Sequence, residues 1–285
     1  MGLDATVLCN CYREGRTTAL PFADLVVLDE DGYLGLSVPY VNNQANYRLF
    51  WKWKETCCEH PRMEYGDEHI ANWSGYRAFQ EALKKADWQN FPTLHAELPE
   101  GNGGVMSAVA AAQALQELEY FKNQADLGSN TFLIETATGE TLHEYIASYD
   151  GLFIYAGSTG LHFGFDQQGF FIVTAQEPIT EVFRARFFEQ RLLEPELTRN
   201  GEKGQVAYIS LESEQQFVCT VAISKNSPWP DGQKKNAQGR VHFDCPTLLH
   251  VETRKINASE FTYILEPLTR IFQAAVKTGN PVRWC

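Results

Sequence analysis

Cysteines and a histidine near the start of the chain are its strongest candidates for chemistry. Cys9 and Cys11 are one residue apart, and Cys57, Cys58 and His60 follow an aromatic stretch further along. Thiolate sulfur and imidazole nitrogen are the donors that tetrahedral Zn²⁺ prefers in proteins. The pattern indicates either a closed Cys₃His zinc site formed by Cys9, Cys11, Cys58 and His60, or packed free thiols, which are the more common role of buried cysteine.

The two halves of this motif must meet in space for either metal binding or thiol chemistry. Cys9 and Cys11 continue a segment that reads as a β-strand from Thr6, and residues i and i+2 of a strand point to one face. Cys58 and His60 are also two residues apart, so a single turn can present both to that face. We expect the four side chains to converge whether or not a metal is bound.

A hydrolase is the alternative that uses the same residues. In a thiol-dependent enzyme Cys58 is the nucleophile, with His60, His69 or His95 as its base. In a metal-dependent enzyme His60 and His69 are ligands, although no H-E-x-x-H spacing is present. Either enzyme should gather Cys58, His60, His69 and a carboxylate in one open cleft, and a binding protein should not.

A second candidate site, for binding rather than chemistry, comprises His69, Asn72 and Trp73. Aromatic side chains are enriched in pockets and interfaces, and they also fill cores. The aromatic stripe at residues 50–53 has the same two interpretations. The sequence therefore leaves open whether these residues bind a partner or pack inside.

The elements that must position these residues follow from hydrophobic periodicity. Apolar residues three and four apart predict helices over residues 72–86, 107–123 and 257–279, and Pro267 should kink the last of them. Between residues 128 and 251 the period changes to two, which predicts roughly seven antiparallel strands.

These elements predict an α+β fold with an antiparallel β-sheet in the middle of the chain and helices from both chain ends packed together. Residues 1–127 and 252–285 form an α-rich unit, and residues 128–251 form a β-rich insertion. The connector at residues 225–239 is longer than an ordinary loop, which indicates a functional or a mobile segment.

Composition restricts the partners. The chain of 285 residues has 24 basic and 36 acidic side chains, a net charge of −12, which repels nucleic acids and anionic membranes. The mildly apolar stretch at residues 105–115 is too short to cross a bilayer, and the first residues lack a signal-peptide pattern. Seven cysteines, an odd number, are typical of reduced thiols. We expect a cytoplasmic protein with no nucleic-acid partner and no membrane partner.

The chain begins MGLDATVLCNC, carries CEH at residues 58–60 and closes with TGNP at residues 278–281. These motifs resemble a family of uncharacterised bacterial cytosolic proteins that open MGLDxxVxCxC. The resemblance covers about residues 1–125 and 257–284, and it implies that the β-rich middle is an insertion. It departs at Cys57, an extra thiol, and at Glu68-His69, where the family has two histidines. It implies no known activity, and it points to Cys9, Cys11, Cys58, His60 and Asn72.

Two function classes fit these observations. The first is a cytosolic protein- or ligand-binding protein of the immunity type without catalysis, because an acidic surface and aromatic stripes suit such partners and no catalytic motif is complete. Its partner is a protein or a small molecule. The second is the metal- or thiol-dependent hydrolase that uses the Cys/His cluster.

Overall fold

Helices and antiparallel strands divide between two compact units. Unit 1 comprises Met1–Leu127 and Asn257–Cys285, and unit 2 comprises Gly128–Ile256. The α+β fold class is confirmed. The computed structural model describes residues 2–29, 33–124, 127–154, 160–193, 196–197, 203–222, 233–235, 241–243 and 247–285. Within these residues, no helix is long and apolar enough to cross a membrane.

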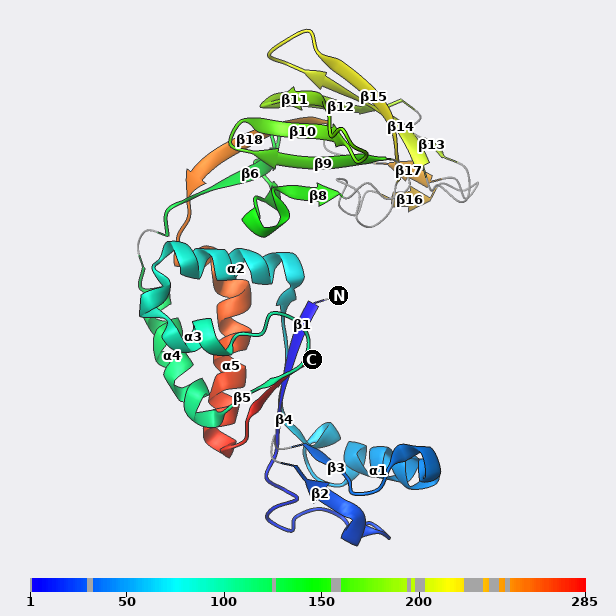
Figure 1. Ribbon diagram of the computed structural model, residues 1–285, viewed down its shortest axis with the longest axis vertical. Helices are drawn as coiled ribbons and strands as arrows, with labels where there is room; N and C mark the ends of the chain where they lie inside the picture. The colour runs from blue at the N-terminus through cyan, green and yellow to red at the C-terminus, as the bar shows by residue number, and fades with distance from the viewer. Residues whose placement is uncertain are drawn as a thin grey trace. The chain divides into compact units, whose positions relative to one another are not determined.

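Unit 1 contains a four-stranded antiparallel sheet in the order β4-β1-β19-β5, which the sequence did not predict (Figure 1). β19 and β5 are too short to show a period of two, so their pairing leaves no pattern in the sequence. The strands of this unit are β1 (Gly2–Leu8), β2 (Val26–Leu28), β3 (Leu34–Leu36), β4 (Glu64–Asn72), β5 (Val105–Met106) and β19 (Val282–Trp284).

The three expected helices of unit 1 are confirmed. Asn72 caps α2, Ser107 caps α4, and a capping box of Asn257 and Glu260 precedes α5, which ends at Gly279 in the left-handed conformation. The helices of this unit are α1 (Gln44–Thr56), α2 (Trp73–Lys85), α3 (Pro92–Glu97), α4 (Ala108–Lys122) and α5 (Thr262–Thr278). α5 continues unbroken through Pro267, where we expected a kink.

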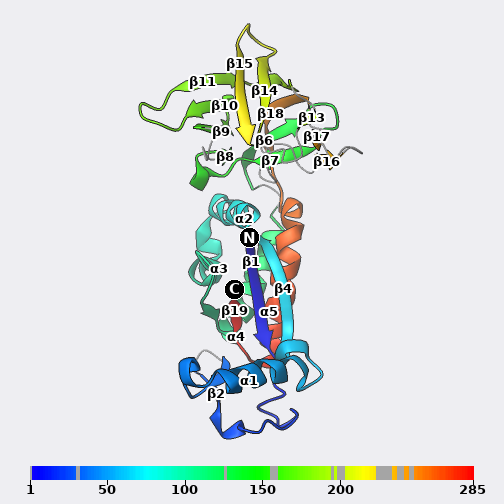
Figure 2. The ribbon, with the colours of Figure 1, turned by 90° about the vertical axis from the view of Figure 1, so that its right-hand side faces the viewer.

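Helix α5 is the centre of unit 1. It packs against β4 and β1 of the sheet and against α4, so the end of the chain joins elements from its first half (Figures 1 and 2). Leu268, Ile271 and Phe272 are completely buried on this helix. The expected packing of the last helix with the early helices is therefore confirmed.

Gly66 allows α5 to approach β4 closely. A Cβ at Gly66 would lie 3.0 Å from both Ala274 Cβ and Ile271 Cδ1, whereas a Cβ at Gly35 in β3 would meet nothing within 4 Å. We expect Gly66→Val to lower the free energy of unfolding by about 1–3 kcal/mol through overpacking. Gly35→Val is the matched control and should leave it unchanged or slightly raised. Equal losses in urea melts of the two variants would contradict this role of Gly66.

Residues 9–63, which we call the N-terminal lobe, have an apolar core of their own. Helix α1 supplies Phe50 and Trp53 to this core, and the indole nitrogen of Trp53 donates a hydrogen bond to the carbonyl of Thr18 at 2.8 Å. Periodicity did not reveal α1 as a helix. The aromatic residues at positions 50–53 therefore differ in burial: Phe50 and Trp53 lie in the core, and Trp51 is half-exposed.

Unit 2 consists of antiparallel strands in three sheets rather than one. Their orders are β15-β14-β12-β18-β6-β7, β11-β10-β9-β8 and β13-β17-β16. The strands are β6 (Ser129–Glu135), β7 (Thr141–Glu144), β8 (Leu152–Ile154), β9 (Leu161–Asp166), β10 (Gly169–Thr174), β11 (Glu181–Ala185), β12 (Phe187–Leu192), β13 (Glu196–Leu197), β14 (Lys203–Ser210), β15 (Gln216–Ala222), β16 (Gln233–Lys235), β17 (Val241–Phe243) and β18 (Leu248–Lys255).

The core of unit 2 is rich in phenylalanine, and Phe170 stacks on Phe188 with ring centroids 4.4 Å apart. Strand β18 runs past residue 252, so this unit extends to Ile256. Most of the connector at residues 225–239 lies outside the described residues, and only its strand β16 is described.

His143 makes the stability of unit 2 depend on pH. Its ring stacks on Phe153 at 4.4 Å, and burial lowers its pKa to about 4. The imidazole of His143 binds a proton at a higher pH in the unfolded chain than in the folded chain. His143 therefore does not lower the free energy of unfolding above about pH 6.5, and it lowers it by up to about 3 kcal/mol as the pH drops to 4. We expect His143→Phe to reduce this loss in melts followed between pH 7 and pH 4. An unchanged pH profile would contradict the assignment.

Candidate metal centre

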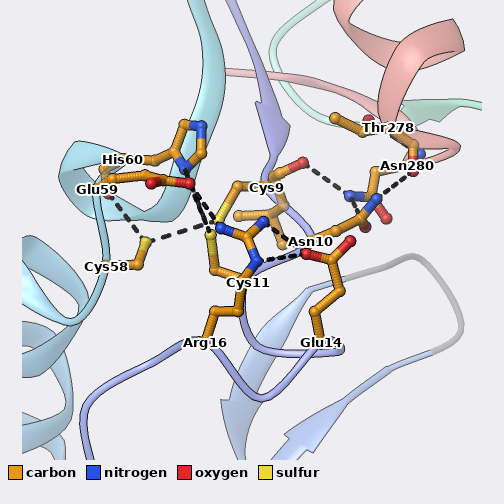
Figure 3. A network of polar contacts seen from close by, with 11 residues as sticks. Cys9, Asn10, Cys11, Glu14, Arg16, Cys58, Glu59, His60, Thr278 and Asn280 are labelled. Atoms are coloured by element: carbon orange, nitrogen blue, oxygen red, sulfur yellow. Dashed lines mark hydrogen bonds and ion pairs between the residues drawn. The ribbon is translucent and has the colours of Figure 1, made fainter.

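Four side chains of the N-terminal lobe converge on one point (Figure 3). The ligand atoms of Cys9, Cys11, Cys58 and His60 all lie within 4.8 Å of one another. Cys9 Sγ is 3.8 Å from Cys58 Sγ, and Cys11 Sγ is 3.4 Å from His60 Nδ1. The expected convergence of the four residues is confirmed.

These distances fit one tetrahedral ion. With Zn–S bonds of about 2.3 Å and a Zn–N bond of about 2.0–2.1 Å, tetrahedral geometry places two sulfurs about 3.8 Å apart and a sulfur and a nitrogen about 3.6 Å apart. The separations of 3.8 Å between Cys9 and Cys58 and 3.4 Å between Cys11 and His60 are close to these values, and the other pairs of ligand atoms lie within 4.8 Å. A Cys₃His set fills all four positions of such an ion, so the arrangement is compatible with a closed metal site.

Cys9 and Cys11 are positioned by a turn and not by a strand, which corrects our expectation. β1 ends at Leu8, and the chain then turns, with the amide of Arg16 donating to the carbonyl of Cys11 at 2.8 Å. The amide of Glu14 donates to the carbonyl of Asn10 at 3.0 Å in the same turn. In a turn the side chains are not restricted to the two alternating faces of a paired strand.

Cys58 and His60 lie between the end of α1 and an irregular turn at Pro61–Met63. Arg62 and Met63 have φ of 55° and 62°. Left-handed backbone costs a non-glycine residue roughly 1–2 kcal/mol, so two in succession persist only where the surrounding structure requires them. The carbonyl of Met63 accepts a hydrogen bond from the amide of Cys9 at 2.8 Å, which ties the two halves of the site together.

Hydrogen bonds of Asn10 and Asn280 link the first cysteine pair to the far end of the chain. The side-chain amide of Asn280 donates to the carbonyl of Leu8 at 2.7 Å and to Asn10 Oδ1 at 2.9 Å. Asn10 in turn donates to the carbonyl of Thr278 at 2.7 Å. Sequence reasoning missed this role, and the signal for it was the closing TGNP motif, which contains Asn280.

Burial favours the protonated form of two thiols of the cluster, Cys9 and Cys11. Burial raises the pKa of Cys9 to about 12 and also raises the pKa of Cys11. Metal binding must therefore release these protons. On the solvent side, the guanidinium of Arg16 donates hydrogen bonds to the carboxylates of Glu59 and Glu14, both at 2.6 Å. The hydrogen bond from Arg16 lowers the pKa of Glu59.

Cys57 is not part of the ligand group. Its side chain is 2% exposed and packs in the core of the lobe, and its carbonyl accepts a hydrogen bond from the amide of Thr18 at 2.8 Å. Its neighbour Cys58 is partly exposed and reaches the cluster. The cysteines that the structure describes are free thiols, and Cys245 lies outside the described residues.

His69 lies away from the cluster. It is on β4, where Nδ1 contacts Asp4 Oδ1 of β1 at 2.6 Å, and both side chains are exposed. Asp4 precedes Cys9 by five residues, and at about 3.3 Å per residue of strand this separates the two sites by roughly 16 Å. His69 and the Cys₃His group therefore cannot act on one substrate atom.

Asn72 and Trp73 have structural contacts at the start of α2. Asn72 Oδ1 accepts the amide of Gly75 at 2.8 Å and so caps the helix. Trp73 packs edge-on against Tyr76 at 5.6 Å, and the guanidinium of Arg77 lies over its ring. Asn72 and Trp73 are close to His69 in the sequence. The contacts that the structure gives them are the cap of α2 and packing against α2.

The pair of Cys58 with an imidazole base, expected for a thiol hydrolase, is not formed among the described residues. The thiol of Cys58 donates to the carbonyl of His60 at 3.5 Å and not to an imidazole, and His95 stacks edge-on against Trp88. A hollow beside Cys9, lined mainly by apolar side chains, holds about one water molecule. This hollow is too small to bind a substrate.

No known protein family, no curated protein and no solved structure matches this chain. The resemblance carried by the MGLDxxVxCxC, CEH and TGNP motifs therefore stays a prediction. The function must be inferred from the geometry of the metal centre and of the surface around it.

Proposed function

We propose that this chain is a cytoplasmic binding protein without catalysis, of the immunity type, whose N-terminal lobe is held together by a structural zinc ion. Cys9, Cys11, Cys58 and His60 are its ligands. The observation that carries the proposal is the convergence of these four side chains, with all four ligand atoms within 4.8 Å of one another.

A structural role follows from the number of ligands and from the size of the lobe. Catalytic zinc keeps one position open for water or substrate, whereas four protein ligands close the site. The lobe spans roughly 55 residues, and segments below about 70–80 residues usually need a metal or disulfides in addition to a core. Zinc would fasten the turn at Cys9–Cys11 to the end of α1.

A binding role is supported by what surrounds the metal centre. His69 and its carboxylate partner Asp4 lie at the other end of β1, so acid–base groups and thiols are separated. The free thiols fit a reducing compartment, and the net charge of −12 disfavours nucleic acids as partners. A protein partner is therefore favoured over a polyanion.

Metal analysis of the purified protein tests this proposal. We expect one zinc per chain, and Co²⁺ exchanged into the site should give the visible spectrum of a tetrahedral cobalt thiolate. Added azide should leave that spectrum unchanged, because a closed site has no position for it. A protein that neither carries nor takes up metal would overturn the zinc assignment, and an azide-dependent spectrum would overturn the structural role.

The hydrolase alternative rests on one contact, Cys11 Sγ to His60 Nδ1 at 3.4 Å. A nucleophile must be reached by substrate and must be a thiolate, but Cys11 is fully buried and its pKa is raised by burial. Iodoacetamide labelling followed by mass spectrometry separates the two proposals. Rapid labelling of Cys11 in the folded, metal-free protein would favour the hydrolase.

A further inference from the structure

An exposed aromatic cluster lies on the solvent side of the N-terminal lobe. Tyr40, Tyr47 and Trp51 form a triangle in which the ring centroids are 5.2 to 5.8 Å apart. Tyr40 is 45% exposed, Trp51 is 51% exposed, and the neighbouring Val41 is 77% exposed. Large apolar side chains gathered on a surface in this way are typical of a docking site.

This cluster is held rigidly. The hydroxyl of Tyr47 donates to the carbonyl of Val38 at 2.9 Å, which fixes its ring against the segment before α1. The side chain of Asn43 donates to the carbonyl of Pro39 at 2.9 Å, so the turn that carries Tyr40 is also fixed. A preorganised aromatic surface loses little conformational entropy when a partner binds.

Two cations lie beside the aromatic cluster on α1. Arg48 and Lys52 are exposed, and within the described part of the chain neither has an ion-pair or hydrogen-bond partner. Arg48 lies three residues before Trp51 and four before Lys52, so at about 100° per residue Arg48 is the helical neighbour of both, and all three are exposed. We call Tyr40, Tyr47, Arg48, Trp51 and Lys52 the α1 surface.

The segment that carries the α1 surface has a net positive charge, opposite to that of the whole chain. Residues 33–54 contain no Asp or Glu, although the chain has 36 acidic residues and a net charge of −12. Glu55 is the one carboxylate of α1, which also carries Arg48, Lys52 and Lys54. A local positive potential in an acidic protein steers a negatively charged partner to this place.

We propose that the α1 surface binds a short acidic segment of a partner protein. An apolar side chain of that segment packs on the rings of Tyr40 and Trp51, while its carboxylates pair with Arg48 and Lys52. Tryptophan, tyrosine and arginine are the residue types that contribute most to binding at protein interfaces. This inference rests on the proposed function, because it names the partner of the zinc-held lobe.

A protein segment fits this surface better than a nucleic acid. Nucleic-acid binding needs many phosphate contacts, each of which contributes to affinity through counterion release. The α1 surface offers two unpaired cations, and the rest of the protein repels a long polyanion. A short acidic peptide needs few charges and gains from apolar packing as well.

The metal centre connects to this surface through α1. The helix ends at Thr56, two residues before Cys58, and its inner side chains Phe50 and Trp53 lie in the same core as Cys9 and Cys11. Binding of zinc would therefore fix the last turn of the helix that presents Trp51 and Lys52. Loss of the metal should weaken binding without removing any contact residue.

A selection from a displayed library of random 12-residue peptides tests the proposal with full-length, metal-loaded protein. We expect enrichment of peptides in which Asp or Glu flank an aromatic residue or leucine. Affinity of an enriched, fluorescein-labelled peptide is then measured by fluorescence anisotropy. The double variant Arg48→Glu, Lys52→Glu should weaken binding at least tenfold, and Trp51→Ala should do the same.

Lys84→Glu with Lys85→Glu on α2 is the matched control, because it makes the same change in net charge away from the α1 surface. Circular dichroism melts establish that each variant is folded. If Trp51→Ala unfolds, the double variant Arg48→Glu, Lys52→Glu still tests the proposal, because both residues are exposed and their substitution should leave the fold intact. Enriched peptides without acidic residues, equal weakening by the control, or tighter binding of single-stranded DNA would each overturn the proposal.

The zinc content of the same preparation separates this inference from the proposed function. Acidic peptides that bind through Trp51 and Lys52 to a protein without zinc would support the docking surface and overturn the zinc assignment. A zinc-containing protein that enriches no acidic peptide would support the zinc assignment and overturn the proposal that the α1 surface binds an acidic segment.

Discussion

Cys11→Ser should cost the N-terminal lobe its metal and most of its ordered structure. Binding of structural zinc contributes about 10–16 kcal/mol in zinc-finger peptides, whereas whole domains are stable by only about 5–15 kcal/mol. Cys11 is completely buried and contacts His60, so serine leaves a weaker ligand at this position. Hydrogen exchange should show lost protection across residues 9–63 and unchanged protection across residues 128–256.

Cys285→Ser is the matched control for this substitution, because Cys285 is an exposed thiol of the same unit and lies outside the ligand group. It should retain one zinc per chain and the wild-type melting temperature. A chelator added to the wild-type protein should reproduce the Cys11→Ser result. If Cys11→Ser destabilises the lobe while the chelator does nothing, the cysteines are packed thiols and not ligands.

Removal of residues 257–285 should abolish the cooperative unfolding of unit 1. The deletion takes away α5, whose buried side chains fill the centre of the unit, and β19, which lies between β1 and β5. It also removes Asn280, which braces the Cys9–Cys11 turn. We expect fragment 1–256 to show the unfolding transition of unit 2 alone in calorimetry. Two undiminished transitions would contradict the central place of α5.

The substitution Asn280→Ala is a milder test than the deletion, because it removes only the side-chain hydrogen bonds of Asn280 and keeps the chain length. Asn280 is 3% exposed, and its loss leaves the carbonyl of Leu8 without this bond, at a cost of about 1–3 kcal/mol. Asn123→Ala, at the exposed end of α4, is the control and should cost less than about 1 kcal/mol. Equal effects of the two substitutions would show that Asn280 does not brace the metal centre.

The sequence is sufficient to predict the four candidate ligands, because the preference of a metal for thiolate and imidazole depends on chemical type. It also predicts helices α2, α4 and α5, since their apolar residues recur at helical spacing and their caps are local. Asn72, Ser107 and Asn257 each bond an amide two or three residues ahead. Interactions between residues so close in the chain can be predicted from the local sequence.

Other features depend on contacts between residues far apart in the chain. β19 has three residues and β5 has two, so neither shows a period of two, and their pairing joins segments far apart in the chain: β19 pairs with β1 on one side and with β5 on the other. The hydrolase alternative predicted that His69 would lie in one cleft with Cys58. The pairing of β4 with β1 instead placed His69 against Asp4, away from the thiols.

The candidate metal centre required both kinds of information. Sequence alone determined which side chains carry suitable ligand atoms, but it assigned Cys9 and Cys11 to a strand that in fact ends at Leu8. Only the tertiary structure decided how the four atoms come together, through the turn after β1, the left-handed residues after His60 and the long-range bonds of Asn280. Hydrogen bonds that span more than 250 residues leave no periodic trace in a sequence, so their effect appears only when the chain is folded.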